Sequence, residues 1–393
     1  METFKTKFSY ILKQNEMLLT ILSKTSSALL RAVGKFIKIK ENRVLITANS
    51  MGYNDSPRVI FKEIMEQEVL SHLEIIWALK DEEMLPKKYR SSVTVVKPDT
   101  PKYFRIALSS KYWISSVNIE RGLSFKKAKT IFLNTWHGIP IKTVGNAVKN
   151  RSDFDWRKTD IVCYSNEKEK EIYKRDFKAT EDSMIASGLP RNDKLYNLKE
   201  SKILELKKSL GLDIEKKIIL YAPTWRDSDD MGKNYKFEVP IDWKLWQEML
   251  GDDYIILLRT HPYVTKLMNV EFNDFVLDYS KYPVINHLLA VSDILISDYS
   301  SVIYDYSILE KPIICYAYDY EDYKNSRGLY FDLEKEIPSG VFKTERQVLE
   351  KILNMDYKKE IKNTKKLKEK RLVYGGSATK ICIDALFGFD KNE

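Results

Sequence analysis

Short apolar runs alternate with longer amphipathic stretches over most of the 393-residue chain. Unbroken apolar runs of this kind are typical of parallel strands covered on both faces, and the stretches between them carry apolar residues at helical spacing. From Arg43 onward the pattern predicts strands at residues 44–48, 74–79, 93–96, 112–115, 130–133, 161–164 and 183–186. Helices such as 58–67 and 167–177 separate them, so this half of the chain reads as a Rossmann-like unit.

A second alternation begins at Lys217, after a charged helical connector at 192–210. Its predicted strands are residues 218–221, 254–258, 275–277, 293–296 and 312–316, with a polar loop at 227–236 and a lysine-rich, solvent-facing helix at 357–371. Two such units in one chain predict an α/β protein with two lobes and a cleft between them. We expect the first lobe at residues 41–195 and the second at residues 196–393.

Residues 1–40 follow a different pattern, with apolar and basic side chains at helical spacing and only Glu2 and Glu16 as acids. One or two basic amphipathic helices are predicted, and such helices bind anionic membrane surfaces. The alternative is an ordinary surface helix docked on the core. No apolar run reaches the length needed to span a bilayer, and no signal peptide is evident.

The composition of the chain narrows the classes of partner that it is expected to bind. The chain carries 65 Lys and Arg against 56 Asp and Glu, a net charge of +9, which favours an anionic partner: nucleic acid, phospholipid or a phosphorylated substrate. The 24 Tyr and 7 Trp are dispersed and no nucleic-acid-binding motif occurs, so nucleic acid is not expected. The three cysteines lack a paired spacing and are expected to be buried thiols in a reducing cytosolic compartment.

The segment SDYSSVIYD at residues 297–305 joins a predicted strand to a predicted helix. Asp298, Ser300 and Ser301 are residues that cap helix N-termini, so the helix should begin there. A helix start at the carboxyl end of a parallel strand favours a phosphate, and Asp305, one turn further, can accept sugar hydroxyls. The alternative is a capped helix with nothing bound.

Two of the four histidines follow predicted strands. His137 stands before Gly138 in TWHGIP, at the sheet edge where ligands bind, and an imidazole there suits a general base. His261 stands near Arg259 in RTHP, which fits a pyrophosphate and its leaving charge. His72 and His287 lie in amphipathic patterns and are expected to be structural. No spacing resembles a metal site.

Three more polar clusters follow predicted strands, and each contains an arginine. Arginines that converge on one crevice with two histidines imply a polyanionic ligand. No P-loop, dinucleotide-binding, nucleophile-elbow or kinase motif occurs, which disfavours those enzyme classes. The candidate residues in these clusters are Arg191 and Asn192 in GLPRND, Thr224 and Arg226 in APTWRD, and Arg327 and Asp332 in RGLYFD.

Together these motifs resemble the CDP-glycerol glycerophosphotransferases of wall teichoic acid and capsule synthesis. The matching segments are TWHGIPIKTVG, GLPRND, APTWRD, LLRTHP, SDYSSVIYD and YAYDYEDY…RGLYFD, in the family's order and spacing. Asn54-Asp55-Ser56-Pro57 looks like the family's amino-terminal turn, where Asn-Pro is commoner. Ile139 stands where the family usually has Thr.

The resemblance implies a GT-B-like fold and transfer of glycerol phosphate from CDP-glycerol to a hydroxyl of an undecaprenyl-linked glycan, with release of CMP. It implies a peripheral protein that acts at the cytoplasmic face of the membrane. No cofactor is expected beyond the substrate CDP-glycerol, and the need for a metal stays open. His137 matches the family's base and His261 its donor-phosphate histidine. The expected donor-binding residues are Thr224, Arg226, Arg259, Ser300, Ser301, Asp305 and Arg327, with Gly138, Arg191, Asn192, Asp298 and Asp332 as further candidates.

Other functions stay open at this point. CDP-ribitol is an alternative donor, and a GT-B glycosyltransferase would share the fold and the phosphate-binding helix. Net charge alone also allows a non-catalytic membrane scaffold or nucleic-acid binder. The length leaves little room for a large extra acceptor-binding domain, which favours a primase or short-chain transferase over a polymerase.

Overall fold

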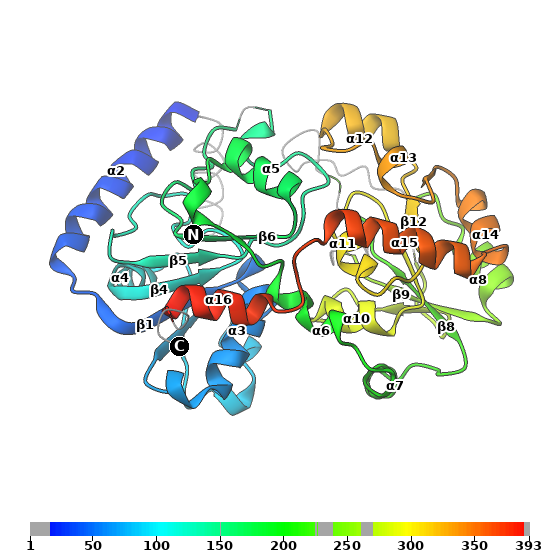
Figure 1. Cartoon of the computed structure of the whole chain (residues 1–393), viewed down its shortest axis with the longest axis horizontal. Coiled ribbons are helices and arrows are strands. Elements are labelled where there is room, and N and C mark those ends of the chain that lie inside the picture. The colour runs from blue at the N-terminus through cyan, green and yellow to red at the C-terminus, as the bar shows by residue number, and fades with distance from the viewer. Residues whose placement is uncertain (1–15, 150, 225, 227–238, 261–269, 389–393) are drawn as a thin grey trace, which may run out of the picture.

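The computed structural model describes residues 16–149, 151–224, 226, 239–260 and 270–388. Two α/β lobes lie side by side along the long axis of the molecule (Figure 1). Each lobe contains one sheet whose neighbouring strands are all parallel. The strand orders are β3-β2-β1-β4-β5-β6-β7 and β10-β9-β8-β11-β12-β13. The predicted two-lobed α/β architecture is confirmed.

In the first sheet the earliest strand, β1, lies in the interior, between β2 and β4. Its strands are β1 (Lys40–Thr47), β2 (Glu74–Ala78), β3 (Thr94–Val96), β4 (Ser110–Ser115), β5 (Ile131–Asn134), β6 (Ile161–Tyr164) and β7 (Met184–Ala186). The longer helices of this lobe are α2 (Glu16–Phe36), α3 (Asp55–Glu66), α4 (Pro101–Ser109) and α5 (Glu167–Phe177). Each predicted strand of this half overlaps an observed one, because buried parallel strands keep an unbroken apolar pattern.

The second sheet is likewise formed by parallel strands. Its strands are β8 (Lys217–Tyr221), β9 (Tyr254–Leu258), β10 (Val276–Asp278), β11 (Ile294–Ser297), β12 (Ile313–Tyr316) and β13 (Val341–Phe342). The helices that follow β7 are α6 (Asp193–Tyr196), α7 (Glu200–Ser209), α8 (Trp243–Leu250), α10 (Ile285–Val291), α11 (Val302–Ser307), α12 (Tyr320–Ser326), α13 (Leu333–Glu336), α14 (Glu345–Leu353), α15 (Tyr357–Arg371) and α16 (Ala378–Phe387). The edge strand β13 was not predicted, since two residues carry no recognisable pattern.

The last helix, α16, returns to the first lobe (red in Figure 1). Cys382, Ile383 and Leu386 are buried in the same core cluster as Val44 and Leu133 of the first sheet. The predicted boundary between residues 195 and 196 assigns α16 to the second lobe. The apolar side of α16 nevertheless completes the core of the first lobe. A short apolar helix does not reveal from its sequence which of two similar cores it covers.

Helix α2 runs along the outer side of the first lobe, away from the second lobe (Figure 1). It docks through small residues: the Ser27 Oγ accepts a hydrogen bond from the Ser124 N–H at 3.0 Å, and a Cβ on Gly34 would lie 2.9 Å from Leu108. Of its larger apolar side chains, Leu30 packs against the core of the lobe, whereas Leu29 and Phe36 point outward, and Phe36 is 88% exposed. The predicted helix is therefore present over 16–36, while residues 1–15 lie outside the described residues.

The two lobes touch through their loops at the carboxyl ends of the sheets. Lys142 of the first lobe and Leu329 of the second form an isolated antiparallel bridge. The Thr143 N–H donates to the Gly328 carbonyl at 3.0 Å, and the Tyr330 N–H donates to the Ile141 carbonyl at 2.8 Å. This contact brings the turn after β5 against the second lobe.

Candidate functional site

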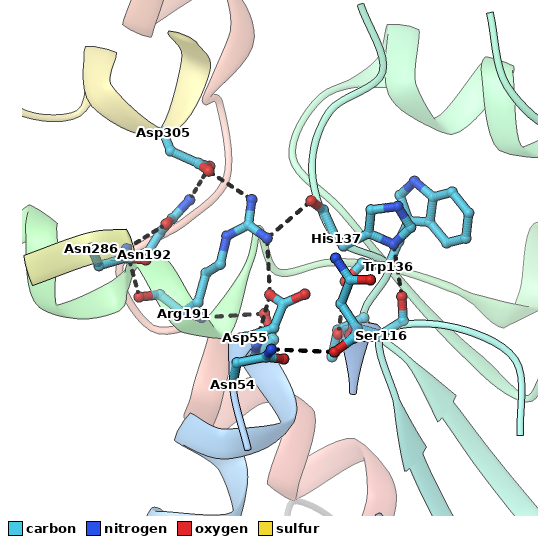
Figure 2. A network of polar contacts seen from close by, with 12 residues as sticks. Asn54, Asp55, Ser116, Trp136, His137, Arg191, Asn192, Asn286 and Asp305 are labelled. Carbon is cyan, nitrogen blue, oxygen red and sulfur yellow. Dashed lines mark hydrogen bonds and ion pairs between the residues drawn. The ribbon is translucent and has the colours of Figure 1, made fainter. Parts of the chain in front are cut away.

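His137 lies in the turn that follows β5, and its ring is anchored by the chain next to it (Figure 2). The ring Nδ1 lies 2.9 Å from the carbonyl oxygen of Ser116, which follows β4. A carbonyl oxygen only accepts, so Nδ1 carries the proton and Nε2 keeps a free lone pair. The Trp136 ring lies over the imidazole, with ring centroids 4.0 Å apart. The arrangement leaves Nε2 as the atom able to take a proton.

The surroundings of His137 keep its imidazole neutral. Burial lowers the pKa of the ring, and the nearby cations Arg191 and Lys142 lower it further. The Ser116 carbonyl and the Asp55 carboxylate act in the opposite direction, but burial dominates. A neutral imidazole near pH 7 is the form that a general base requires.

Gly138, the next residue, allows a close approach between the lobes. Its φ is +139°, and a Cβ there would lie 2.2 Å from the Ser301 Oγ of the second lobe. Ser301 is the N-cap residue of α11, and the Ser300 Oγ accepts a hydrogen bond from the Val302 N–H at 3.3 Å. The helix therefore begins where the sequence predicts, and the His137 turn abuts its first residues.

Asp305 and Arg191 form a cluster that joins the lobes, as Figure 2 shows. The Asp305 carboxylate accepts hydrogen bonds from Arg191 Nη2 and from Asn192 Nδ2, both at 2.6 Å. Arg191 Nη1 also donates to Asp55 Oδ1 and to the His137 carbonyl oxygen, both at 2.9 Å. We call these residues (Asp55, Arg191, Asn192 and Asp305) the Arg191 cluster. Its arginine bridges a carboxylate from each lobe.

A second cluster, the Arg226 cluster, lies wholly within the second lobe. Arg226 pairs with Asp298 at 2.9 Å and with Asp319 at 2.7 Å, and donates to the Thr224 carbonyl at 2.7 Å. Its guanidinium lies 4.8 Å from the ring centroid of Tyr299. Asp298 accepts the Thr224 N–H at 2.8 Å. The Arg226 cluster therefore fixes the turn that follows β8 against the strand end of β11.

The other predicted site residues are spread more widely. Arg259, after β9, donates to the carbonyl oxygens of Tyr279 and Tyr282, and burial lowers its pKa. The Arg327 carbonyl accepts from Thr143 Oγ1 at the contact between the lobes. Asp332 accepts hydrogen bonds from the Glu334 N–H and from Tyr320 Oη, at the start of α13. His261 lies outside the described residues.

Three residues that hold the site were not among the sequence candidates. Asp55 lies in the Asn54–Pro57 turn and has φ +58°, and Asp319 pairs with Arg226. Asn286 of α10 donates to the Arg191 carbonyl at 3.0 Å. Asp55 and Asp319 lie in two of the segments that resemble the family, the Asn54–Pro57 turn and YAYDYEDY, whereas Asn286 had no sequence signal. Which side chains contact a buried arginine depends on how distant segments fold together, so local sequence does not reveal them.

The other two histidines, His72 and His287, each make a local polar contact. His287 Nδ1 lies 2.8 Å from Tyr282 Oη, and burial together with nearby cations lowers its pKa to about 4. His72 Nδ1 lies 3.1 Å from the Val69 carbonyl. Among the described residues, no group of three or more His, Cys, Asp or Glu side chains is arranged to hold a metal ion.

Comparison with known proteins gives consistent results. Residues 29–377 match the sequence model of the family described as CDP-Glycerol:Poly(glycerophosphate) glycerophosphotransferase. The chain is 32% identical over 327 residues to a teichoic acid poly(glycerol phosphate) polymerase of Staphylococcus epidermidis, covering 77% of this chain and 44% of that protein. It is 30% identical over 387 residues to the polymerase of the same name from Bacillus spizizenii, covering 94% and 98%. The chain thus spans less than half of one relative and nearly all of the other.

Comparison with solved structures points to the same family. The wall teichoic acid polymerase TagF, in a variant soaked with CDPG, superposes with a TM-score of 0.78 at 26% identity, covering 92% of this chain and 93% of that one. Further curated relatives are named as a glycerol-phosphate transferase, a glycerol-phosphate primase and a ribitol-phosphate polymerase. The predicted GT-B-like fold is confirmed.

Proposed function

The chain belongs to the CDP-glycerol:poly(glycerophosphate) glycerophosphotransferase family, and we propose that it transfers glycerol phosphate from CDP-glycerol to a hydroxyl of a membrane lipid-linked glycan, releasing CMP. The observation that carries this proposal is the approach of Gly138 to Ser301. This approach supports the proposal because His137, the proposed base, precedes Gly138, and Ser301 is one of the proposed donor-phosphate residues.

In the proposed reaction, His137 Nε2 removes the proton from the acceptor hydroxyl. The oxygen attacks the phosphorus that carries glycerol, a new P–O bond forms, and the bond to the CMP oxygen breaks. Ser300, Ser301 and Thr224 are placed to contact the pyrophosphate, with Arg259 and His261 offsetting the leaving charge. Arg226 acts through the Arg226 cluster, because both of its carboxylate partners already occupy its guanidinium.

The acceptor side of the proposal involves a membrane surface. No helix in the described ranges has the length and apolar character to cross a bilayer. Helix α2 instead exposes an apolar stripe at spacings of seven, four and three residues, which is one helix face. The residues of this stripe are Leu22, Leu29, Val33 and Phe36.

A basic pocket opens beside the carboxyl end of this stripe. Its volume is about 590 Å³, and Glu41 is the acid among its lining residues. An apolar stripe next to clustered cations suits the headgroup region of an anionic leaflet. This supports peripheral attachment at the cytoplasmic face, with α2 against the lipid. The cations that line the pocket are Arg31, Lys35, Lys38, Lys126, Lys127 and Lys129.

The activity is tested by CMP release from the full chain, given CDP-glycerol or CDP-ribitol and a synthetic lipid-linked disaccharide with or without one glycerol phosphate. We expect release with CDP-glycerol. Release only with CDP-ribitol would mean that the chain transfers ribitol phosphate rather than glycerol phosphate, consistent with the relatives named as ribitol-phosphate polymerases. The acceptor that supports turnover separates priming from extension. No release with either donor would overturn the proposed function.

Membrane attachment is tested with the double variant Leu29→Asp, Phe36→Asp, and vesicles containing phosphatidylglycerol. We expect most of the vesicle binding to be lost, because two carboxylates replace exposed apolar contacts and repel the surface. The matched control is Leu353→Asp, which changes an exposed leucine of the second lobe (49% exposed). Equal binding by both variants would remove α2 from the membrane contact.

A further inference from the structure

We propose that Arg191 is a positioning residue, which sets the His137 base against the donor lobe by binding the main chain of His137 and the Asp305 side chain of α11 at the same time. This inference rests on the proposed function. It differs from the sequence-based expectation, in which a loop arginine facing the crevice contacts the polyanionic ligand.

Arg191 reaches the base through its backbone. Nη1 donates to the His137 carbonyl oxygen at 2.9 Å, while the imidazole Nδ1 is held by the Ser116 carbonyl. His137 is therefore fixed at two points, one on the ring and one on the main chain. With both points fixed, the direction of Nε2 depends on where Arg191 lies.

The position of Arg191 is set in turn by both lobes (Figure 2). Its side chain is 10% exposed, and those of its partners Asp55 and Asp305 are 7% and 5% exposed. Ion pairs this well buried and hydrogen-bonded are not released easily, because either charge left alone would be strongly destabilising. A pyrophosphate would have to displace two buried carboxylates to bind this guanidinium, so a ligand-binding role fits the geometry poorly.

The backbone of Arg191 is held as well. Asn286 of α10 donates to the Arg191 carbonyl at 3.0 Å and to Asn192 Oδ1 at 2.9 Å. The Arg191 N–H donates to Ser56 Oγ at 3.3 Å. The arginine is thus preorganised by elements of both lobes before any substrate arrives.

Two strained residues flank the contacts of Arg191. Asp55 has φ +58° and Trp136, directly before His137, has φ +52°, values that L-residues seldom adopt. Such conformations persist only where surrounding contacts enforce them, and they concentrate at functional sites. Arg191 bonds to Asp55 and to the residue after Trp136, so its loss would let both segments relax.

The test compares Arg191→Lys and Arg191→Gln with wild type in the CDP-glycerol assay. A lysine keeps the charge but not the fork that reaches three acceptors. We expect kcat to fall roughly 10–100-fold in both variants, as for a misplaced catalytic group, with the KM for CDP-glycerol within about two-fold.

The pH profile adds a readout that loss of stability alone does not move. The charged groups that face His137 are Asp55, Arg191 and Lys142. Arg191→Gln removes a cation, so the pKa of the base rises and the acidic limb of kcat/KM moves to higher pH. Arg191→Lys retains the cation and leaves the limb near its wild-type position.

Arg371→Lys is the matched control. Arg371 pairs with Glu336 outside the Arg191 cluster, and their side chains are 7% and 3% exposed. We expect it to lower Tm as Arg191→Lys does while kcat stays near wild type. A normal kcat in the Arg191 variants, or a large rise in KM with kcat unchanged, would overturn the positioning role. Absence of wild-type turnover would instead refute the proposed function.

Discussion

The Arg191 and Arg226 clusters use the same chemistry for different purposes. Each centres on a largely buried guanidinium between two carboxylates. The partners of Arg226 follow β11 and β12 of one sheet, whereas those of Arg191 come from α3 in the first lobe and α11 in the second. The Arg226 cluster lies within one lobe, whereas the Arg191 cluster joins the two lobes.

The difference shows that burial and charge do not assign a role to an arginine. Removing Arg226 should act on folding stability, because its contacts stay within one unit. Removing Arg191 should act on turnover, because its contacts join the base to the donor helix. Four predictions test this difference between the two clusters, and the first concerns His137, the proposed base.

His137→Gln should lower kcat by about 10²–10⁴-fold, the usual contribution of a general base. CDP-glycerol affinity, measured by calorimetry, should stay near wild type, since the donor contacts lie in the second lobe. His287→Gln changes a half-buried histidine that pairs with Tyr282 and should retain normal turnover. Normal turnover by His137→Gln would exclude His137 as the base.

Arg226→Met should lower the free energy of unfolding by about 3–5 kcal/mol, because Asp298 and Asp319 would keep buried charges without their partner. Urea denaturation measures this loss. Arg346→Met breaks an exposed pair with Glu350 and should change stability by only about 0–1 kcal/mol. Unchanged stability in Arg226→Met, with a raised KM for CDP-glycerol, would make Arg226 a ligand contact and remove the contrast between the clusters.

Gly138→Ala should lower kcat roughly 10–100-fold, because the new Cβ meets Ser301 and pushes the base away from the donor helix. Gly122→Ala is the control, since Gly122 also has positive φ (+79°) but nothing within 4 Å of the new Cβ. Both variants carry backbone strain, and only Gly138→Ala should lose turnover. Equal kinetics would show that the lobes tolerate a wider spacing.

The pH dependence of kcat/KM should show the smallest effect. The reaction needs neutral His137, and burial lowers the pKa of this ring below 6.5. The rate should therefore hold as pH falls through 6.5 and decline only at lower pH, where the ring becomes protonated. A decline that begins above pH 6.5 would contradict the buried, neutral base.

Most of the fold could be predicted because buried parallel strands keep an unbroken apolar pattern. Each predicted strand overlaps an observed one, and the predicted helices 167–177 and 357–371 match α5 and α15. The side of α2 that docks on the lobe could not be predicted, because the sequence allowed either a membrane surface or the core as the partner of its apolar residues. Ser27, Gly34 and Leu30 pack on the lobe and leave Leu29 and Phe36 outside.

The candidate site was only partly predictable. Strand-end placement indicated His137, and N-cap chemistry indicated the start of α11 at Ser300 and Ser301, which the structure brings together with Gly138. Which arginines face one another or a carboxylate depends on contacts between distant segments. Arg191 and Asp305 are 114 residues apart in sequence, and no local pattern links them.

The return of α16 to the first lobe has a consequence for the order in which the protein matures. Val44 emerges early in synthesis, yet it shares a core cluster with Leu386 near the end of the chain. The first lobe made is thus the last to be completed, while the second can close its own core beforehand. A chain that stops before residue 378 therefore lacks the helix that packs on the sheet from which the His137 turn extends.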